Sequence, residues 1–268
     1  MVEKYEIHLF KKIKNLIIYN VFLFFEFIGL KVVPKWRWEK HELEYNIKNL
    51  FKLLEIDCVI DVGANKGQFG KFLRNNIGYR GDIISFEPVI ETFNILSDQS
   101  KVDPFWRVYR FALGEKMGNK EINITKESQL NSFLDPIETG INFVDELNTT
   151  KRKEIVQIIT LDYFFNENKN LLNNKKIFLK LDTQGYDLEV LEGGTESIPR
   201  ILGLQTEISC IPIYSNMLSF IKSLETLKEK GFDVTGMFPV NQDKYYRVIE
   251  FDCVCVNTKE IESMVVNK

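Results

Sequence analysis

The sequence predicts an α/β fold in which a mainly parallel sheet carries helices on both faces. Short apolar runs rich in β-branched and aliphatic residues occur at 58–62, 82–86, 176–181 and 201–206. Segments of helical length and spacing separate them, and most of the runs end at glycines or acids. Strands that alternate with helices in this way form parallel sheets, so we expect βαβ units.

Length and composition limit the organisation to one large core. The chain has 268 residues, 44% of them hydrophobic and 27% charged. We expect a helical segment at 1–54, one α/β domain at 55–258 and a tail at 259–268. The net charge is −3, with a pI near 5.7, so no overall positive field attracts nucleic acid, and we expect no nucleic-acid partner.

The turn after the first strand predicts a ligand site. Gly63 permits a positive φ and close backbone approach, and Gly67 allows a helix to begin against the strand. Only three residues separate these glycines, so the turn is not a Walker A loop. Asn65 stands where a dinucleotide fingerprint needs its second glycine, which disfavours pyrophosphate. Asp61 before the turn suits a cationic or hydroxyl-bearing ligand, a description that S-adenosylmethionine fits.

A second acid lies where a ribose ligand requires one. Glu87 ends the next strand, 20 residues after Gly67, and Pro88 follows it. In the βαβ arrangement an acid at this interval hydrogen-bonds ribose hydroxyls. An NAD-dependent oxidoreductase is the alternative enzyme, weakened by Asn65. A non-catalytic S-adenosylmethionine-binding module is the alternative outside catalysis.

The chain resembles the FkbM-type S-adenosylmethionine-dependent methyltransferases over roughly residues 56–257. The motifs that carry the resemblance lie at 61–69 (Asp-Val-Gly-Ala-Asn-Lys-Gly-Gln-Phe), 85–88, 112–114, 160–164 and 179–194. The resemblance implies a Rossmann-like class I methyltransferase fold whose sheet is closed by an antiparallel terminal hairpin. It also implies cofactor contacts from the glycine turn with Asn65, from Phe69, from Ala112 and from Ser132 in a serine-bearing turn. Many members resemble Lys-x-Asp-Val-Glu-Gly at the last motif, whereas Thr183 and Gln184 stand here and remove one carboxylate.

Methyl transfer to a hydroxyl needs a group that removes the proton. A general base contributes about 10²–10⁴-fold, and both histidines precede the glycine turn, so a carboxylate is expected to act. Asp182 is the first candidate because it follows a central strand, and Glu207 is the second. The alternatives are that both hold a divalent cation that lowers the acceptor pKa, or that Asp182 caps the helix after Gly185.

The segments that would recognise the acceptor are polar. We expect alternating runs at 120–125 and 155–160 to form an antiparallel addition on the sheet edge, separated by a lid or recognition loop at 135–153. Tyr214 and the turn at 241–245 would complete the site. Family resemblance and this mixture of amides, acids and tyrosines favour a sugar, glycan or nucleotide-sugar acceptor.

The N-terminal segment is strongly apolar. Residues 16–33 are apolar nearly all round, interrupted by Asn20 and Glu26. A central acid costs ~2.5–3.5 kcal/mol or more in a spanning helix, so a transmembrane span is disfavoured. We expect packing on the domain or a homodimer through residues 10–38, with peripheral membrane contact as the alternative.

The cysteines and the chain start favour a cytoplasmic protein. We expect the four cysteines (Cys58, Cys210, Cys253 and Cys255) to be reduced, buried thiols, and a zinc site at the last two is disfavoured. No signal peptide is recognisable among the mixed charges near the start. A cytoplasmic location with membrane-peripheral attachment as the alternative is therefore expected.

Overall fold

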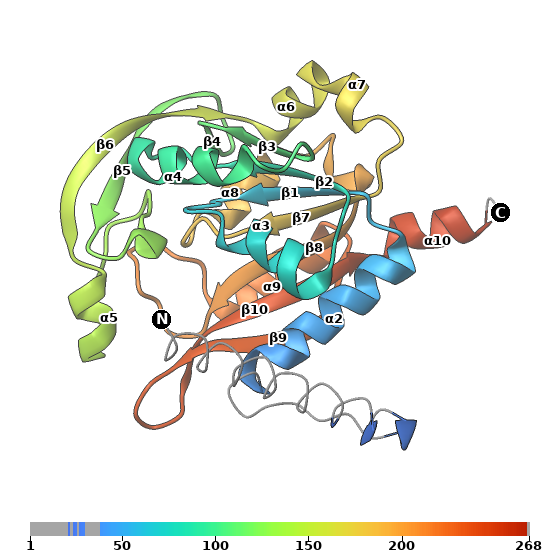
Figure 1. Cartoon of the computed structure of the whole chain (residues 1–268). Helices are drawn as coiled ribbons and strands as arrows, with labels where there is room; N and C mark the ends of the chain where they lie inside the picture. The colour runs from blue at the N-terminus through green and yellow to red at the C-terminus, as the bar shows by residue number, and fades with distance from the viewer. Residues whose placement is uncertain (1–20, 22–23, 26, 30–37, 267–268) are drawn as a thin grey trace, which may run out of the picture. The chain divides into compact units, whose positions relative to one another are not determined.

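The computed structural model describes residues 21, 24–25, 27–29 and 38–266 (Figure 1). One compact unit begins at Leu43 and contains the predicted α/β domain. The predictions for residues 10–38 fall largely outside the described residues. Within the part of the chain that is described, no helix is both long and apolar enough to cross a membrane.

The compact unit is built on a seven-stranded sheet of order β3-β2-β1-β7-β8-β10-β9. In that order the strands are β3 (Trp106–Tyr109), β2 (Asp82–Phe86), β1 (Cys58–Val62), β7 (Ile177–Leu181), β8 (Ile201–Ser209), β10 (Val248–Asn257) and β9 (Phe232–Gln242). Neighbours from β3 to β8 pair in parallel, and β10 is antiparallel to both of its neighbours. The predicted parallel sheet and its antiparallel terminal hairpin are therefore confirmed.

Helices cover both faces of this sheet, as predicted (Figure 1). One face packs against α6 (Leu161–Glu167), α7 (Lys169–Leu172), α8 (Asp187–Glu192) and α9 (Phe220–Glu229). The other packs against α2 (Trp38–Leu54), α3 (Gln68–Phe72) with the π-helical turn Leu73–Ile77, and α4 (Ile90–Ser100). Because strands such as β1 are buried on both faces, their sequences are apolar at nearly every position rather than alternating, with Asp61 as the exception in β1.

The boundaries of the unit differ from the expected ones at both ends. Ile47, Leu50 and Phe51 of α2 are buried in the core, so the compact unit begins at Leu43 rather than at residue 55. The expected tail forms α10 (Thr258–Val266), and its Ile261 packs against the same core. Apolar residues at helical spacing explain both extensions.

The alternating segments form a separate sheet, so their predicted place on the main sheet edge is wrong. β5 (Gly118–Thr125) and β6 (Thr150–Ile159) pair antiparallel, and β6 also pairs with β4 (Ala112–Leu113). Their inward apolar side chains make a small core of their own with Val89. This second burial surface, which the alternation alone does not reveal, explains why the strands leave the main sheet.

Three of the four cysteines are buried in strands, as predicted, and one is exposed. Cys58, Cys253 and Cys255 are buried and free, and the last two sulfurs lie 3.6 Å apart on one face of β10. Cys210 is free but exposed, so the prediction that it is buried is wrong. It lies just beyond the end of β8, where the chain leaves the core.

The most constrained position of the fold is Gly63. It follows β1 with φ +78°, and a Cβ built there would lie 1.9 Å from the backbone carbonyl oxygen of Asp182. Real Cβ atoms do not approach backbone so closely. The turn after β1 and the segment after β7 therefore touch through main chain, which only glycine permits.

We expect Gly63→Ala to destabilise the fold by at least about 3 kcal/mol, because it combines the steric clash with a left-handed φ that alone costs about 1–2 kcal/mol. Gly78→Ala is the matched control, since Gly78 has φ +77° but nothing within 4 Å of its Cβ position. Urea unfolding monitored by circular dichroism measures both variants. Equal losses of stability in the two would contradict the close approach.

Candidate active site

The glycine turn joins the carboxyl ends of β1 and β2. The amides of Gly63 and Ala64 both donate to the carbonyl oxygen of Phe86, at 3.0 and 2.9 Å. Gly63, Asn65 and Gly67 adopt φ angles of 78°, 47° and 82°. Gly67 then precedes α3 directly. The predicted strand, tight turn and helix are therefore present, and the turn is fixed to the neighbouring strand.

Glu87 fastens this turn from the end of β2. Its Oε2 accepts a hydrogen bond from the Asn65 amide at 2.8 Å, and its Oε1 accepts from the Val89 amide at 2.9 Å and the Thr92 hydroxyl at 2.8 Å. Burial raises the pKa of Glu87 to about 7, although the bonds from Thr92, Val89 and Asn65 oppose the rise. A carboxylate has about four lone-pair sites, so Glu87 can accept further bonds from ligand hydroxyls.

Lys180 is a buried cation between two carboxylates. Its Nζ donates to Asp182 Oδ2 at 2.7 Å and lies 4.0 Å from Asp61 Oδ1. Burial lowers the pKa of Lys180, but Asp182 and Asp61 outweigh that effect and hold it above its usual range. Lys180 is therefore charged, and it compensates one carboxylate from β1 and one at the carboxyl end of β7.

Asp61, predicted to bind the cofactor, is fully buried in β1. Its Oδ2 accepts from the Ser85 hydroxyl at 3.2 Å, and its Oδ1 has no hydrogen-bond partner among the described residues. Burial raises the pKa of Asp61 to about 6, while Lys180 acts in the opposite direction. In this structure Asp61 can influence a ligand through its charge and its hold on Lys180.

Asp182 and Glu207, the two predicted bases, are bridged by Gln184. The Gln184 Nε2 donates to Asp182 Oδ1 at 3.1 Å and to Glu207 Oε2 at 2.7 Å. Both oxygens of Asp182 therefore carry a donor, one from Lys180 and one from Gln184. Among the hydrogen bonds of the described residues, Glu207 uses only Oε2, so its Oε1 remains open.

The environments of these two acids differ. Burial raises the pKa of Glu207 well above its usual range, and Asp182 and Glu250 add to the effect. Glu250 lies nearby in β10, where burial raises its pKa to about 7 despite a hydrogen bond from Ser209. Glu207 therefore holds a proton more readily than an exposed glutamate does, which follows from its burial and its place among acids.

Asp182 does not cap the following helix, so that alternative is wrong. The N-cap position of α8 is Tyr186, and no side chain caps this helix. Asp187, the first residue of α8, accepts through Oδ1 from the Thr183 amide at 2.8 Å and from the Thr183 hydroxyl. Its Oδ2 accepts from the Thr206 hydroxyl at 2.6 Å. Asp182 therefore does not cap a helix, and its carboxylate pairs with Lys180.

Tyr214 and Ser132 hold Gln184 from the other side. The Tyr214 hydroxyl lies 3.0 Å from Gln184 Oε1 and 2.8 Å from the Leu130 carbonyl oxygen. The Ser132 hydroxyl donates to the Gln184 carbonyl oxygen at 2.7 Å. Both predicted site residues are nearly fully buried, with 1% of their surface exposed. In this structure they position Gln184 instead of presenting open surface to a ligand.

The two remaining predicted cofactor residues, Phe69 and Ala112, lie in different parts of the structure. Phe69 stacks on Phe72 and has its ring centroid 5.3 Å from the Lys180 Nζ, which brings it to the centre of the site. Ala112 lies in β4 and is buried in the small core of the second sheet with Val89. Of the predicted residues, the structure therefore brings the glycine turn, Glu87, Asp61, Phe69, Asp182 and Glu207 to one region.

The predicted loop at 135–153 is partly ordered secondary structure. It contains α5 (Asn142–Leu147), and the first residues of β6 complete it. Ile141 and Val144 pack with Ile213 and Tyr214, while the Ile137 amide donates to the Ile213 carbonyl oxygen at 3.2 Å. The segment therefore packs against Tyr214, which contacts Gln184. The apolar residues Ile141 and Val144 were the sequence feature that indicated this packing.

The predicted recognition turn at 241–245 joins β9 and β10. Asp243 fixes it by accepting from the Tyr245 amide at 2.8 Å and from the Arg247 Nε at 2.6 Å. Tyr245 and Tyr246 are exposed at the tip. The turn therefore offers aromatic surface, while its acid is used internally.

Two residues at the centre of the site, Lys180 and Gln184, were not predicted from the sequence. Lys180 interrupts the otherwise apolar strand β7, and a charge inside a buried strand was a signal that it must be paired. Gln184 was noted only as a departure from the family motif. No sequence pattern showed that its side chain would turn back between two acids.

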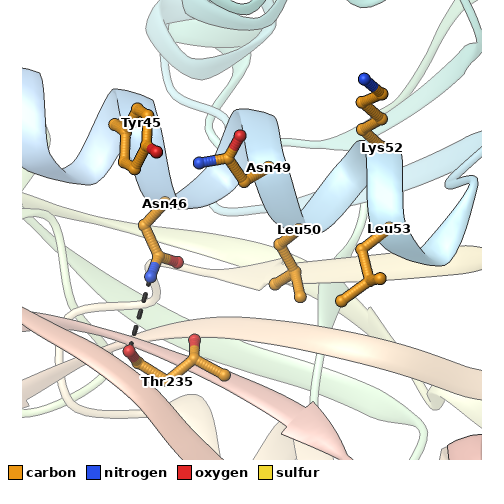
Figure 2. A pocket seen from close by; sticks show the side chains of 7 residues that line it. All are labelled: Tyr45, Asn46, Asn49, Leu50, Lys52, Leu53 and Thr235. Carbon is orange, nitrogen blue, oxygen red and sulfur yellow. Dashed lines mark hydrogen bonds between the residues drawn. The ribbon is translucent and has the colours of Figure 1, made fainter.

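A hollow of about 680 Å³ lies elsewhere, between α2 and β9 (Figure 2). Its lining residues are Tyr45, Asn46, Asn49, Leu50, Lys52, Leu53 and Thr235. None of the predicted site residues lines it. The Asn46 Nδ2 donates to the Thr235 carbonyl oxygen at 3.4 Å across it. The chemistry-bearing residues are therefore separate from this hollow.

Solved structures with a similar fold include several methyltransferases. Fibrillarin from Aeropyrum pernix with bound S-adenosyl-L-methionine is 10% identical, with a TM-score of 0.42 over 75% of this chain and 66% of that one. Precorrin-6y C5,15-methyltransferase from Geobacter metallireducens GS-15 is 12% identical, with a TM-score of 0.41 over 80% and 87%. Magnesium protoporphyrin IX methyltransferase from Synechocystis PCC 6803 is 8% identical, with a TM-score of 0.40 over 84% and 86%.

The family is established by sequence. No curated protein matches the chain. Residues 61–234, which begin at Asp61 in β1 and end in β9, match the family described as Methyltransferase FkbM domain. This match spans more than half of the 268 residues and contains the glycine turn, Glu87, Lys180 and Glu207. The chain therefore belongs to the FkbM methyltransferase domain family, and its sheet has the Rossmann-like class I methyltransferase fold.

Proposed function

We propose that this FkbM-family methyltransferase transfers a methyl group from S-adenosylmethionine to a hydroxyl of a sugar, glycan or nucleotide-sugar. The observation that carries the proposal is the pair of differently engaged carboxylates beside the glycine turn. Glu87 retains capacity for ligand hydroxyls, and Glu207 has one open oxygen. The first suits a ribose and the second suits an acceptor that must lose a proton.

The residues at the carboxyl ends of β1 and β2 fit S-adenosylmethionine better than NAD. Asn65 has a side chain where a pyrophosphate would need glycine, and its Oδ1 accepts from the Ser128 hydroxyl at 3.1 Å. Asp61 Oδ1 accepts no hydrogen bond among the described residues and lies 4.0 Å from Lys180 Nζ. Asp61 and Asp182 are two carboxylates against the single cation Lys180, so local charge favours a cation over an anion. Glu87 and the turn would hold the nucleoside, which keeps the oxidoreductase alternative disfavoured.

Glu207 is the better choice for the proton acceptor. When bound, S-adenosylmethionine supplies an electrophilic methyl group on a sulfonium. The acceptor oxygen would form its bond to the methyl carbon as the methyl–sulfur bond breaks and S-adenosylhomocysteine leaves, and Glu207 Oε1 would take the proton of the acceptor hydroxyl. Asp182 cannot serve as easily, because Lys180 and Gln184 occupy both of its oxygens. Its role is that of a fixed negative charge.

We propose a polyhydroxylated molecule as the methyl acceptor. We assign to the acceptor side the buried acids Glu207 and Glu250 and, as expected from the sequence, the β9–β10 turn with its exposed Tyr245 and Tyr246. Carboxylates accept hydrogen bonds from hydroxyls, and exposed aromatic rings can lie against the apolar face of a sugar. A cytoplasmic location likewise stays a prediction.

We expect methyl label from S-adenosylmethionine to appear on a sugar hydroxyl in a screen of free glycans, sugar nucleotides, catechols and peptides. Glu207→Gln should lower kcat by at least 100-fold, because an amide cannot take the proton. Asp182→Asn should lower kcat less. Label found only on a peptide nitrogen or a catechol would refute the proposed acceptor class. Full activity of Glu207→Gln would show that Glu207 is not the general base.

We expect the affinity for S-adenosylhomocysteine to fall roughly tenfold between pH 8 and pH 6. The pKa of Glu87 is raised to about 7, so it is ionised at pH 8 and largely protonated at pH 6, where it accepts hydroxyl donors less well. Calorimetric titration at each pH measures the effect. Glu87→Gln should bind more weakly at pH 8 and lose most of the pH dependence. An unchanged pH dependence in that variant would show that Glu87 does not contact the ligand.

A further inference from the structure

Gln184 occupies the space between two carboxylates that would otherwise suit a cation. Its single Nε2 lies 3.1 Å from Asp182 Oδ1 and 2.7 Å from Glu207 Oε2. The amide nitrogen carries two hydrogens, so one can point at each acid. A divalent cation bridging the same two oxygens would have to displace this nitrogen.

The orientation of the amide is fixed by its other contacts. Gln184 Oε1 lies 3.0 Å from the Tyr214 hydroxyl, and reversing the amide would place an oxygen against two carboxylates. The backbone is held too, because Ser132 donates to the Gln184 carbonyl oxygen and the residue has φ 53° in the left-handed region. Gln184 is 7% exposed. Its side chain therefore has one well-supported position.

We propose that the Gln184 amide takes the place of a bridging cation and is the positioning residue for Glu207. By holding Glu207 Oε2, the amide leaves Oε1 directed at the acceptor. This positioning role rests on the proposed function. The replacement of a cation rests on geometry alone. A carboxylate at position 184 would bring three acids together, and oxygen ligands of that kind hold Mg²⁺, Mn²⁺ or Ca²⁺.

Calorimetric titration of Mn²⁺ into metal-stripped, full-length protein tests the replacement. Wild-type protein should show no Mn²⁺ binding that depends on Glu207, because the amide fills the bridge. Gln184→Glu should bind Mn²⁺ at least tenfold more tightly than wild type, and adding Glu207→Gln to it should abolish the gain. If circular dichroism shows that Gln184→Glu does not fold, Gln184→Ala replaces it, since it removes the amide and keeps both acids.

Wild-type Mn²⁺ binding that Asp182→Asn or Glu207→Gln removes would overturn the proposal, because a cation would then displace the amide. No gain of Mn²⁺ binding in either folded variant at position 184 would also overturn it. These titrations use neither S-adenosylmethionine nor an acceptor. Their outcome is therefore independent of whether the proposed methyl transfer is found.

The positioning role has its own measurement, the pH profile of methyl transfer by Gln184→Asn. The shorter amide cannot reach both acids, so kcat should fall at least tenfold while KM for the acceptor changes little. The acidic limb should move to higher pH, because Glu207 loses a donor that favours its charged form. A changed KM with an unmoved limb would indicate a structural role and contradict the proposal.

Discussion

The arrangement of the site depends on one buried cation, Lys180. It lies in β7 at the centre of the sheet, where its register partners are Asp61 in β1 and Gln205 in β8. Asp61 is fully buried and Asp182 lies close by, so a compensating charge is needed for both carboxylates to stay ionised. Because Asp61 precedes the glycine turn and Asp182 leads to Gln184, the same cation connects the proposed cofactor half to the acceptor half.

The consequence is a site whose acids have different tasks. Asp182 is neutralised by Lys180 and bridged by Gln184, whereas Glu207 and Glu250 have no cation among their hydrogen-bond partners in the described residues. Burial among like charges makes the latter two more basic. In the proposed function, proton removal would therefore fall to Glu207 in β8, one strand further from the glycine turn than Asp182.

The sequence predicted the sheet well because its signals are local. The β1 run, the two glycines of the turn and Glu87 each follow from backbone requirements that act within a few residues. The separate β4-β6-β5 sheet could not be predicted, since alternation shows that a face is buried but not against what. The residues at 258–266 were missed as a helix for a related reason, because only tertiary packing of Ile261 supports it.

The site was predicted in its composition but not in its connections. Asp182 and Glu207 were both recognised, yet their order of importance depends on Lys180 and Gln184, whose side chains meet them only after β7 and β8 pair. Tyr214 was expected to help recognise the acceptor, and its burial beside Gln184 follows from its packing with α5. Gln184 and Glu207 are 23 residues apart, and Tyr214 contacts residues 30 and 84 positions before it, which no local pattern specifies.

The central claim is that the glycine turn and Glu87 bind an S-adenosyl nucleoside and not a dinucleotide. Thermal unfolding of the full-length protein with each ligand tests it most directly, because a ligand of the native state raises the melting temperature by mass action. We predict that saturating S-adenosylhomocysteine raises the melting temperature by several degrees and that NAD leaves it unchanged. Stabilisation by NAD without stabilisation by S-adenosylhomocysteine would contradict the account.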